Sequence, residues 1–329
     1  MGFLAVLVAL VLEQIKPLPR ESSLHEALRA FVAWCGRNFD AGRAHHAWVA
    51  WGAAVGVPSL LTVAIYLPLR HQGTLFGLAF DVAVLYGTLG FRQFSHYFGD
   101  IRDALERGDE DQARALLAEW RHLDTSELPR TEVLRHAIEH ALLAAHRHVF
   151  GVFFWFVALS ALGLGPVGAV LYRLAEFCSR YWSFRQRALE APVNTALLDL
   201  SRRLFALIDF VPARLTAFGF AIVGDFEAAV AGWRRNASLW QQPNEGIILA
   251  AAAGAVGVQL GGAAPPGVTP DRRKTFTSGA APELAAAAGS TGGAPAQPGH
   301  LASVVGLVWR SVVLWLVLAG LLTAAHVLG

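Results

Sequence analysis

Charged residues are scarce in this chain. Only 16% of its 329 residues are Asp, Glu, Lys or Arg, while 54% are apolar, and a soluble domain usually carries about a quarter charged residues. The formal net charge is only +2 and the basic residues are spread along the chain, which argues against nucleic acid as a partner. The composition therefore indicates an integral membrane protein that contacts membrane lipid.

Cysteine is nearly absent. Cys35 and Cys178 form no CxxC or other metal-ligand spacing and adjoin apolar segments, so we interpret them as buried free thiols. The sequence also lacks a Walker A loop, a nucleophile elbow and a dinucleotide fingerprint. No segment shows the apolar-polar alternation of a strand, which leaves an all-α fold.

Long apolar runs predict a polytopic membrane helical bundle. Residues 47–69 and 304–328 fit spanning helices, and residues 74–91 must return as another despite Asp81, for which functional and hydrogen-bonded structural roles are both open. Residues 2–12 form a shorter, marginal helix. In residues 149–172 a glycine and proline cluster predicts a broken, re-entrant hairpin, because the Arg-rich loops then share one side.

The remaining segments set the domain organisation. Residues 92–148 predict a cytoplasmic helical hairpin, with helix starts at a capping box beginning at Asp109 and at Asp124-Thr-Ser126. Residues 263–300 are rich in Gly, Ala and Pro and predict a flexible linker. We expect a helical membrane domain (1–262), this linker and a C-terminal transmembrane helix (301–329). Basic cytoplasmic loops favour a multi-pass protein of a bacterial inner membrane, and the oligomeric state stays open.

The stretch from Glu132 to Trp155 begins as a charged helix and continues without a break as an apolar one. At 100° per residue an ionisable stripe occupies one face of its first part, opposite an apolar face; the stripe contains Glu132, His136, Glu139, His140 and Arg147. Charged groups that enter a bilayer or a large apolar core are costly and usually have a role. The stripe is therefore a candidate ligand-binding surface.

Part of the stripe, His136-Ala-Ile-Glu139-His140, matches the inverted zincin motif H-x-x-E-H. Five residues on a charged helix match by chance, and no third ligand is evident. We therefore expect no metal site and interpret these residues as a solvated or ion-paired polar face.

Two further candidates lie near helix starts. Asp209 and Arg214 flank Pro212, and either an internal salt bridge or anion capture by Arg214 explains them. Asn244, in Pro243-Asn-Glu-Gly246, is either an ordinary N-cap or part of an anion-binding helix start.

Three motifs resemble the CobD/CbiB family of cobalamin-biosynthesis membrane proteins. The family's N-x-x-P-A-R-L-T-A block is similar to Asp209-Phe-Val-Pro-Ala-Arg-Leu-Thr-Ala217. Its S-P-N-x-G block is similar to Pro243-Asn-Glu-Gly246, and its A-G-A-L-G-x-x-L-G-G block to Ala253-Gly-Ala-Val-Gly-Val-Gln-Leu-Gly-Gly262. Asp124-Thr125-Ser-Glu-Leu128 is similar to G-R-D-T-S-x-L. The chain resembles the AmpE-like branch of this family still more closely; that branch is named for modulating β-lactamase induction. The segments that carry this resemblance are the apolar start ending at Glu13, Phe153-Phe-Trp155 and Phe210-Val-Pro-Ala-Arg-Leu215.

The resemblance implies adenosylcobinamide-phosphate synthesis, in which ATP drives amide formation between a corrin carboxylate and an aminopropanol phosphate. The chain departs from the acid-rich pattern of that chemistry. Where the family reads E-T-x-A-E-N-x-x-D-G, Glu139 is kept, but Leu143, Ala144 and Arg147 stand at the second Glu, the Asn and the Asp. Asp209 replaces the Asn of the P-A-R-L block.

These departures set the functional expectation. We expect an accessory or regulatory member that keeps the scaffold without the condensation activity, with an anionic small molecule or a protein as partner; cofactors are unknown. The alternative is a divergent synthase that uses ATP and magnesium, with Glu139 and Asp124 catalytic. Candidate ligand-binding residues are Thr125, Glu132, His136, His140, Arg147, Asp209, Arg214 and Asn244.

Overall fold

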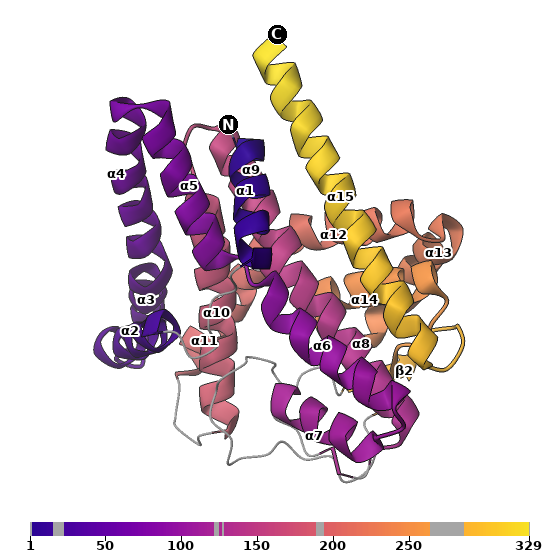
Figure 1. Ribbon diagram of the computed structural model, residues 1–329. Helices are drawn as coiled ribbons and strands as arrows, with labels where there is room; N and C mark the ends of the chain where they lie inside the picture. The colour runs from indigo at the N-terminus through magenta and orange to yellow at the C-terminus, as the bar shows by residue number, and fades with distance from the viewer. Residues whose placement is uncertain are drawn as a thin grey trace. The chain divides into compact units, whose positions relative to one another are not determined.

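The computed structural model describes residues 2–15, 23–121, 125–126, 128–188, 194–263 and 286–328 (Figure 1). These residues are helical almost throughout, with one two-stranded antiparallel sheet, so the all-α prediction is confirmed. The helices of the first half are α1 (Gly2–Ile15), α2 (Ser23–Phe39), α3 (Ala44–Trp51), η1 (Gly52–Gly56), α4 (Val57–Gln72), α5 (Thr74–Thr88), α6 (Phe91–Glu106), α7 (Glu110–Arg121), α8 (Arg130–Ala145), η2 (His146–Phe150) and α9 (Gly151–Ala161). The remaining elements are α10 (Val167–Ala188), α11 (Thr195–Ile208), α12 (Phe210–Val223), α13 (Phe226–Asn236), η3 (Ala237–Leu239), α14 (Pro243–Val256), β1 (Gly261–Ala263), β2 (Ala286–Ser290) and α15 (Pro298–Leu328).

The chain folds into two compact units. Unit 1 comprises Met1–Arg92, Arg147–Asp209 and Leu318–Gly329, and unit 2 comprises Gln93–His146 and Phe210–Val317. In unit 1, α10 packs against α9, α11, α4 and α5; in unit 2, α14 packs against α12, α13 and α8. Each unit therefore has one central helix of its own, α10 or α14.

Three helices within the described ranges are long and apolar enough to cross a membrane: Ala44–Gln72, Arg130–Ala161 and Pro298–Ala325. The bent pair α11–α12 would make a fourth if it counts as one span. The predicted spans at residues 47–69 and 304–328 correspond to the first and third of these. By contrast, α1 and α5 are shorter apolar helices. Asp81 on α5 is buried, and within the described residues its Oδ1 has no hydrogen-bond partner.

The glycine and proline cluster after residue 161 ends one helix and starts another that packs back on it, as the hairpin prediction requires. Gly163 and Gly165 have positive φ (80° and 62°), which a turn of this kind requires of glycine. A Cβ on Gly168 would overlap the Trp155 carbonyl, and one on Gly151 would overlap the Tyr172 ring. Both glycines therefore fix the register of the α9–α10 pair. The arginines expected in the following loop lie instead on α10 and α11; they are Arg173, Arg180, Arg185, Arg187, Arg202 and Arg203.

The hydrophilic segment forms the expected helical hairpin, α6–α7. Asp109 caps α7, since its Oδ1 accepts a hydrogen bond from the Gln112 amide at 2.9 Å. The second predicted cap was wrong: α8 begins after Pro129, which supplies no side-chain cap. The Thr125 hydroxyl instead donates to the Arg114 carbonyl at 2.7 Å. Asp124 lies outside the described residues.

Part of the predicted linker is ordered against the end of α14. β2 pairs with β1, and the backbone of Thr291 and Ala294 bonds to residues 257–260. α15 already begins at Pro298. Small residues allow this close approach: a Cβ on Gly293 would meet the Gly257 carbonyl at 2.8 Å. Residues 264–285 lie outside the described ranges, and the domain boundaries stay a prediction.

Candidate functional site

The part of the polar stripe that lies on α8, from Glu132 to His140, is inside unit 2, whereas Arg147 belongs to η2 and unit 1. Every residue from Val133 to Ala145 is buried, so His136, Glu139 and His140 are not solvated, whereas Glu132 keeps 26% of its side-chain surface exposed. Arg135 holds this part of the stripe together: its Nε lies 3.1 Å from Glu132 Oε2, its Nη2 also contacts that oxygen, and its Nη1 lies 3.2 Å from Glu139 Oε1. A guanidinium between two carboxylates supplies the partners that buried charges require.

Glu139 is the most enclosed member of the stripe, with no exposed surface. Besides Arg135, its Oε1 accepts a hydrogen bond from the Gly261 amide at 2.7 Å. Its Oε2 lies 3.6 Å from His136 Nδ1. The carboxylate therefore joins α8 to the first residue of β1, where the third sequence motif ends.

Arg135 was not among the sequence candidates. Its Cα lies outside the predicted stripe, but its long side chain reaches back to Glu132 and forward to Glu139. The i, i+3 and i, i+4 spacings of these charges were a usable signal.

His140 turns away from the other members of the H-x-x-E-H match. Its ring packs edge-on against Trp120, with 4.4 Å between ring centroids, and Trp120 stacks on Tyr97. Among the residues that the structure describes, no three His, Cys, Asp or Glu side chains are placed to hold a metal ion. The H-x-x-E-H match is therefore part of a packed, ion-paired core.

Arg214 and Asn244 meet in unit 2. Arg214 Nη1 donates to the Phe210 carbonyl at 2.7 Å and to Asn244 Oδ1 at 3.3 Å, and its guanidinium lies over the Phe210 ring. Asn244 is not the N-cap of α14, because Gln242 occupies that position and the helix starts at Pro243. Asn244 therefore joins the first turns of α12 and α14.

Asp209 belongs to a second polar cluster, in unit 1. It accepts a hydrogen bond from the Tyr172 hydroxyl at 2.8 Å, and both residues are buried. Glu176 lies one turn further along α10 and is buried. Its Oε2 is 3.1 Å from Arg173 Nη1, and its Oε1 is 3.3 Å from Arg180 Nε. Burial alone would raise the pKa of Glu176, but Arg180, Arg173 and Arg147 outweigh it and hold the pKa below its ordinary value.

Sequence reasoning missed Glu176, Arg173 and Arg180 because it placed this segment in a loop. On a helix, Tyr172, Glu176 and Arg180 share one face, and the four-residue spacing could have indicated it. Of the sequence candidates, the structure brings Arg147 and Asp209 to this cluster.

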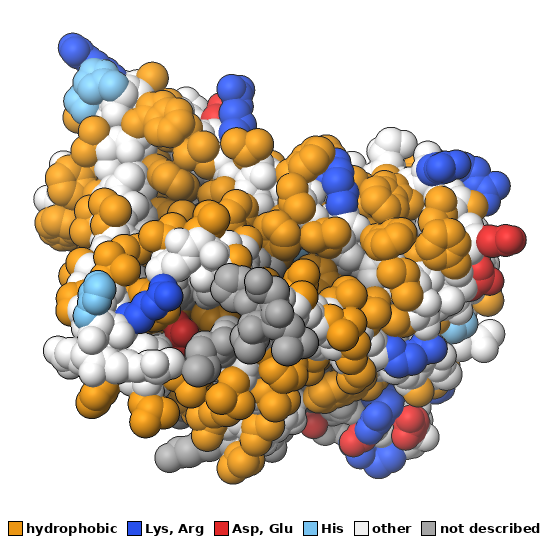
Figure 2. Space-filling model, turned by 90° about the horizontal axis from the view of Figure 1, so that it is seen from above, with side chains coloured by type: hydrophobic (Ala, Val, Ile, Leu, Met, Phe, Trp, Pro, Cys, Tyr) orange, Lys and Arg blue, Asp and Glu red, His pale blue; other side chains and the backbone are white. Residues whose placement is uncertain are grey.

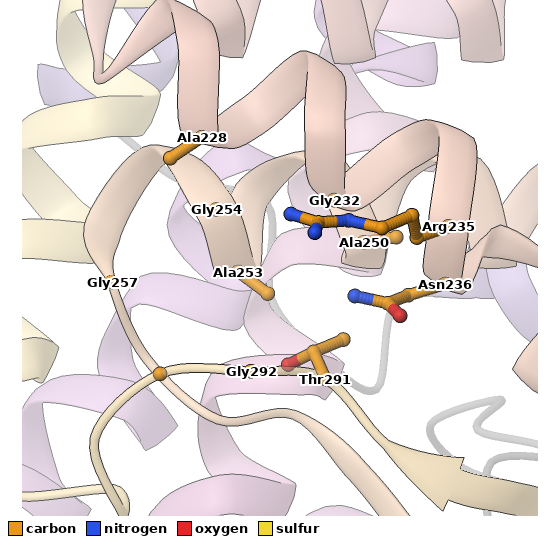
Figure 3. A pocket seen from close by; sticks show the side chains of 11 residues that line it. Ala228, Gly232, Arg235, Asn236, Ala250, Ala253, Gly254, Gly257, Thr291 and Gly292 are labelled. Atoms are coloured by element: carbon orange, nitrogen blue, oxygen red, sulfur yellow. The ribbon is translucent and has the colours of Figure 1, made fainter.

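The third motif lines a pocket of about 390 Å³ in unit 2 (Figure 3). Its wall consists of small residues of α14, including Ala250, Ala253 and Gly254. Arg235 and Asn236 enter it from the end of α13 and Thr291 from the segment after β2. A Cβ on Gly254 would overlap the Ala228 carbonyl, so the glycine-rich sequence is needed for helix packing around this pocket.

Comparison with known proteins matches residues 4–292 to the family described as CobD/Cbib protein. The chain belongs to the CobD/CbiB family. A Cobalamin biosynthesis protein CobD of Stutzerimonas stutzeri is 32% identical over 317 residues, which cover 95% of each chain. Proteins with the same name from Chromobacterium violaceum (36% identical; 56% of this chain and 55% of the relative) and Mycobacterium tuberculosis (29%; 64% and 65%) match shorter stretches. No solved structure matches.

The structure places the three motifs that resemble the CobD/CbiB family near one another in the chain's second unit. They form the start of α12, the start of α14 and the α14–β1 connection, all in unit 2. The Arg147–Glu176 cluster lies in unit 1 and shares Asp209, the first residue of the first motif, with these motifs.

Proposed function

We propose that this chain is an accessory or regulatory membrane protein of the CobD/CbiB family that binds an anionic ligand and does not perform the family's condensation. The enclosure of Glu139 carries this proposal. A carboxylate that activates an amine or holds a metal must reach its substrate, whereas this one has no exposed surface and is paired with Arg135 and the Gly261 amide.

The neighbouring positions support the same conclusion. Leu143 and Ala144, which stand where the family pattern has Glu and Asn, are buried apolar residues. Arg147 stands where that pattern has Asp, so the local charge is reversed. Magnesium that holds a nucleotide takes one or two protein carboxylates and leaves its other positions to phosphate and water. Glu139 has no exposed surface to offer such an ion, so this carboxylate does not fit a magnesium–ATP complex.

The second candidate is a divergent adenosylcobinamide-phosphate synthase. The nearly full-length match to a protein named for cobalamin biosynthesis favours it. Glu139 and Asp124 would then be catalytic, and ATP and magnesium would be required.

Complementation of a bacterial strain that lacks its cobinamide-phosphate synthase separates the two candidates. We expect no growth rescue by the wild-type chain, although immunoblotting shows it in the membrane. Rescue that Glu139→Ala and Asp124→Ala abolish, while the exposed Glu227→Ala keeps it, would overturn the accessory proposal. A synthase from the same family serves as the positive control.

We also propose an inner-membrane, multi-pass location. Exposed apolar side chains on the candidate spans support it, among them Leu60, Leu61, Leu321 and Leu322. Membrane fractionation should recover the chain with inner-membrane markers after carbonate washing; recovery in the soluble fraction would contradict this location.

A further inference from the structure

Two polar side chains at the end of α13, Arg235 and Asn236, extend into the pocket of Figure 3, whose lining residues all belong to unit 2. Arg235 Nε donates to the Ala231 carbonyl at 3.3 Å, one turn back on its own helix. Its two terminal nitrogens have no hydrogen bond or ion pair within the described residues. The Asn236 side chain makes no capping hydrogen bond at the start of η3. Both side chains therefore have donors left for a ligand.

The acceptors around the pocket are already engaged. The Ala253 carbonyl accepts from the Gly257 amide, and the Gly257 carbonyl accepts from the Ala294 amide. Thr291 Oγ1 accepts from the Leu260 amide at 2.9 Å. The unused polar capacity is thus chiefly the guanidinium of the α13 end, which carries donors and no acceptor and selects an anionic group.

The pocket favours a ligand with a single negative charge. Of the described residues that line it, Arg235 alone is charged. This residue lies in the last turn of α13, where the helix dipole is negative and opposes additional negative charge. One guanidinium pairs with one carboxylate through two parallel hydrogen bonds, whereas a phosphate dianion would keep an uncompensated charge. A carboxylate therefore fits better than a phosphate.

The rest of the wall determines the body of the ligand. It consists mostly of alanine and glycine, including Ala228, Gly232, Ala250 and Gly254, so no side chain longer than a methyl group prevents a flat apolar group from approaching the backbone. A benzene molecule occupies a cavity of about 150 Å³. The pocket of about 390 Å³ therefore has room for a small ring system together with its carboxylate.

We propose that this pocket binds a small monocarboxylate with an apolar, ring-sized body. Arg235 pairs with the carboxylate, Asn236 donates a further hydrogen bond to it, and the alanine and glycine wall packs against the body. This assignment rests on the anionic-ligand part of the proposed function and does not depend on whether the chain catalyses condensation.

The test measures binding of benzoate and 2-naphthoate by calorimetry to the full-length protein in a neutral detergent, with titrations into detergent alone subtracted. Both should bind saturably. Benzamide, which has the same ring without the charge, should bind about tenfold more weakly than benzoate or worse, because it loses the charge-assisted pair. Acetate should also bind more weakly because it lacks the apolar body, and inorganic phosphate should bind more weakly than either aromatic carboxylate.

Variants locate the binding. Arg235→Gln should weaken 2-naphthoate binding about tenfold or more, and Arg235→Lys, which keeps the charge without the planar fork, should weaken it less. Arg234→Gln, next to it on α13 and outside the pocket lining, is the matched control and should leave binding unchanged.

A second pair of variants tests the pocket itself. A Cβ on Gly292, in the pocket lining, meets nothing within 4 Å, so Gly292→Leu should place its side chain in open space and weaken binding. Gly299→Leu meets nothing within 4 Å either and lies outside the lining, so it should have no effect. Circular dichroism checks that all variants are folded.

Equal weakening by Arg234→Gln and Arg235→Gln would show unspecific charge attraction and overturn the site. The proposal is also wrong if neither aromatic carboxylate binds saturably at millimolar concentration, if phosphate or acetate binds more tightly, or if folded Gly292→Leu binds as wild type does. Growth rescue in the complementation experiment would refute the accessory function without affecting these binding results, so the two failures can be told apart.

Discussion

Two buried carboxylates, Glu139 and Glu176, are neutralised in different ways. Glu139 has a guanidinium and a backbone amide as close partners, both within its own unit. Glu176 lies beside Arg180 and Arg173, and together with Arg147 they lower its pKa. The first arrangement joins α8 to β1 and leaves Glu139 Oε2 without a hydrogen-bond donor among the described residues, whereas in the second two arginines of α10 flank one carboxylate of the same helix.

Replacing Glu139 should therefore destabilise unit 2. We expect Glu139→Ala to cost about 3–5 kcal/mol, because Arg135 loses a buried partner and the Gly261 amide loses its acceptor. Glu139→Gln should cost less, since it can still accept from Gly261. Denaturant unfolding in detergent measures both. Glu227→Ala is the exposed control, and equal effects of all three would contradict the structural role.

The second prediction concerns Glu176 and the stability of the folded protein at acid pH. Its folded-state pKa lies below the ordinary value of 4.5, so its ionisation stabilises the fold above pH 4.5 and that contribution is lost as pH falls below it. Between pH 6 and pH 3, wild-type stability should fall more steeply than that of Glu176→Gln. Thermal unfolding across this interval gives both slopes, and identical slopes would show that the carboxylate contributes nothing.

At the scale of elements, glycines decide where helices touch. Gly168 and Gly151 let α9 and α10 approach closely, and Gly254 does the same for α14 against α13. In each case a side chain would occupy the position of a neighbouring backbone or ring. These glycines place the Arg147–Glu176 cluster and the pocket of Figure 3.

Gly168→Ala should separate the α9–α10 pair. Its Cβ would overlap a backbone carbonyl that cannot move freely, and overpacking of this kind costs about 1–3 kcal/mol or more. Gly87→Ala on α5 meets nothing within 4 Å and should be neutral or stabilising. Thermal unfolding compares the two variants. A Gly168→Ala protein as stable as Gly87→Ala would refute the register.

The elements were largely predictable from sequence because apolar runs and helix-start signals are local. The cap at Asp109 and the turn at Gly163 and Gly165 were confirmed. The cap predicted at residues 124–126 was wrong because α8 begins after Pro129 and Thr125 bonds elsewhere. Site geometry was less predictable: Arg135 reaches across its own helix, and Glu176 meets Arg147 only through the α9–α10 contact, which local patterns do not encode.

Over the whole molecule, apolar side chains cover much of the face seen in Figure 2. Some of the most exposed are Leu60 on α4, Leu75 on α5 and Leu322 on α15, with 64–79% of their surface accessible. A soluble protein rarely exposes so much apolar surface. Lipid is therefore the expected neighbour of these helices.

Because both native cysteines are buried, introduced cysteines can report the membrane topology. Cys35 and Cys178 are both buried, so an impermeant maleimide should label wild-type protein weakly. Arg185→Cys should stay unlabelled in intact cells because basic segments favour the cytoplasm, while His71→Cys, beside the short turn at Gly73, should be labelled. Detergent-permeabilised cells provide the control, and labelling of Arg185→Cys in intact cells would reverse the proposed orientation.

The register of the α9–α10 pair also determines which changes of chain length the protein can tolerate. Extra residues in the turn at 162–166 leave Gly151 opposite Tyr172, so Arg147 still faces Glu176. One extra residue between Arg147 and Gly151 would instead rotate Arg147 by about 100° and advance it by about 1.5 Å relative to these contacts. Related proteins that retain the arginine cluster should therefore vary in the length of this turn and keep the spacing between residues 147 and 155 constant.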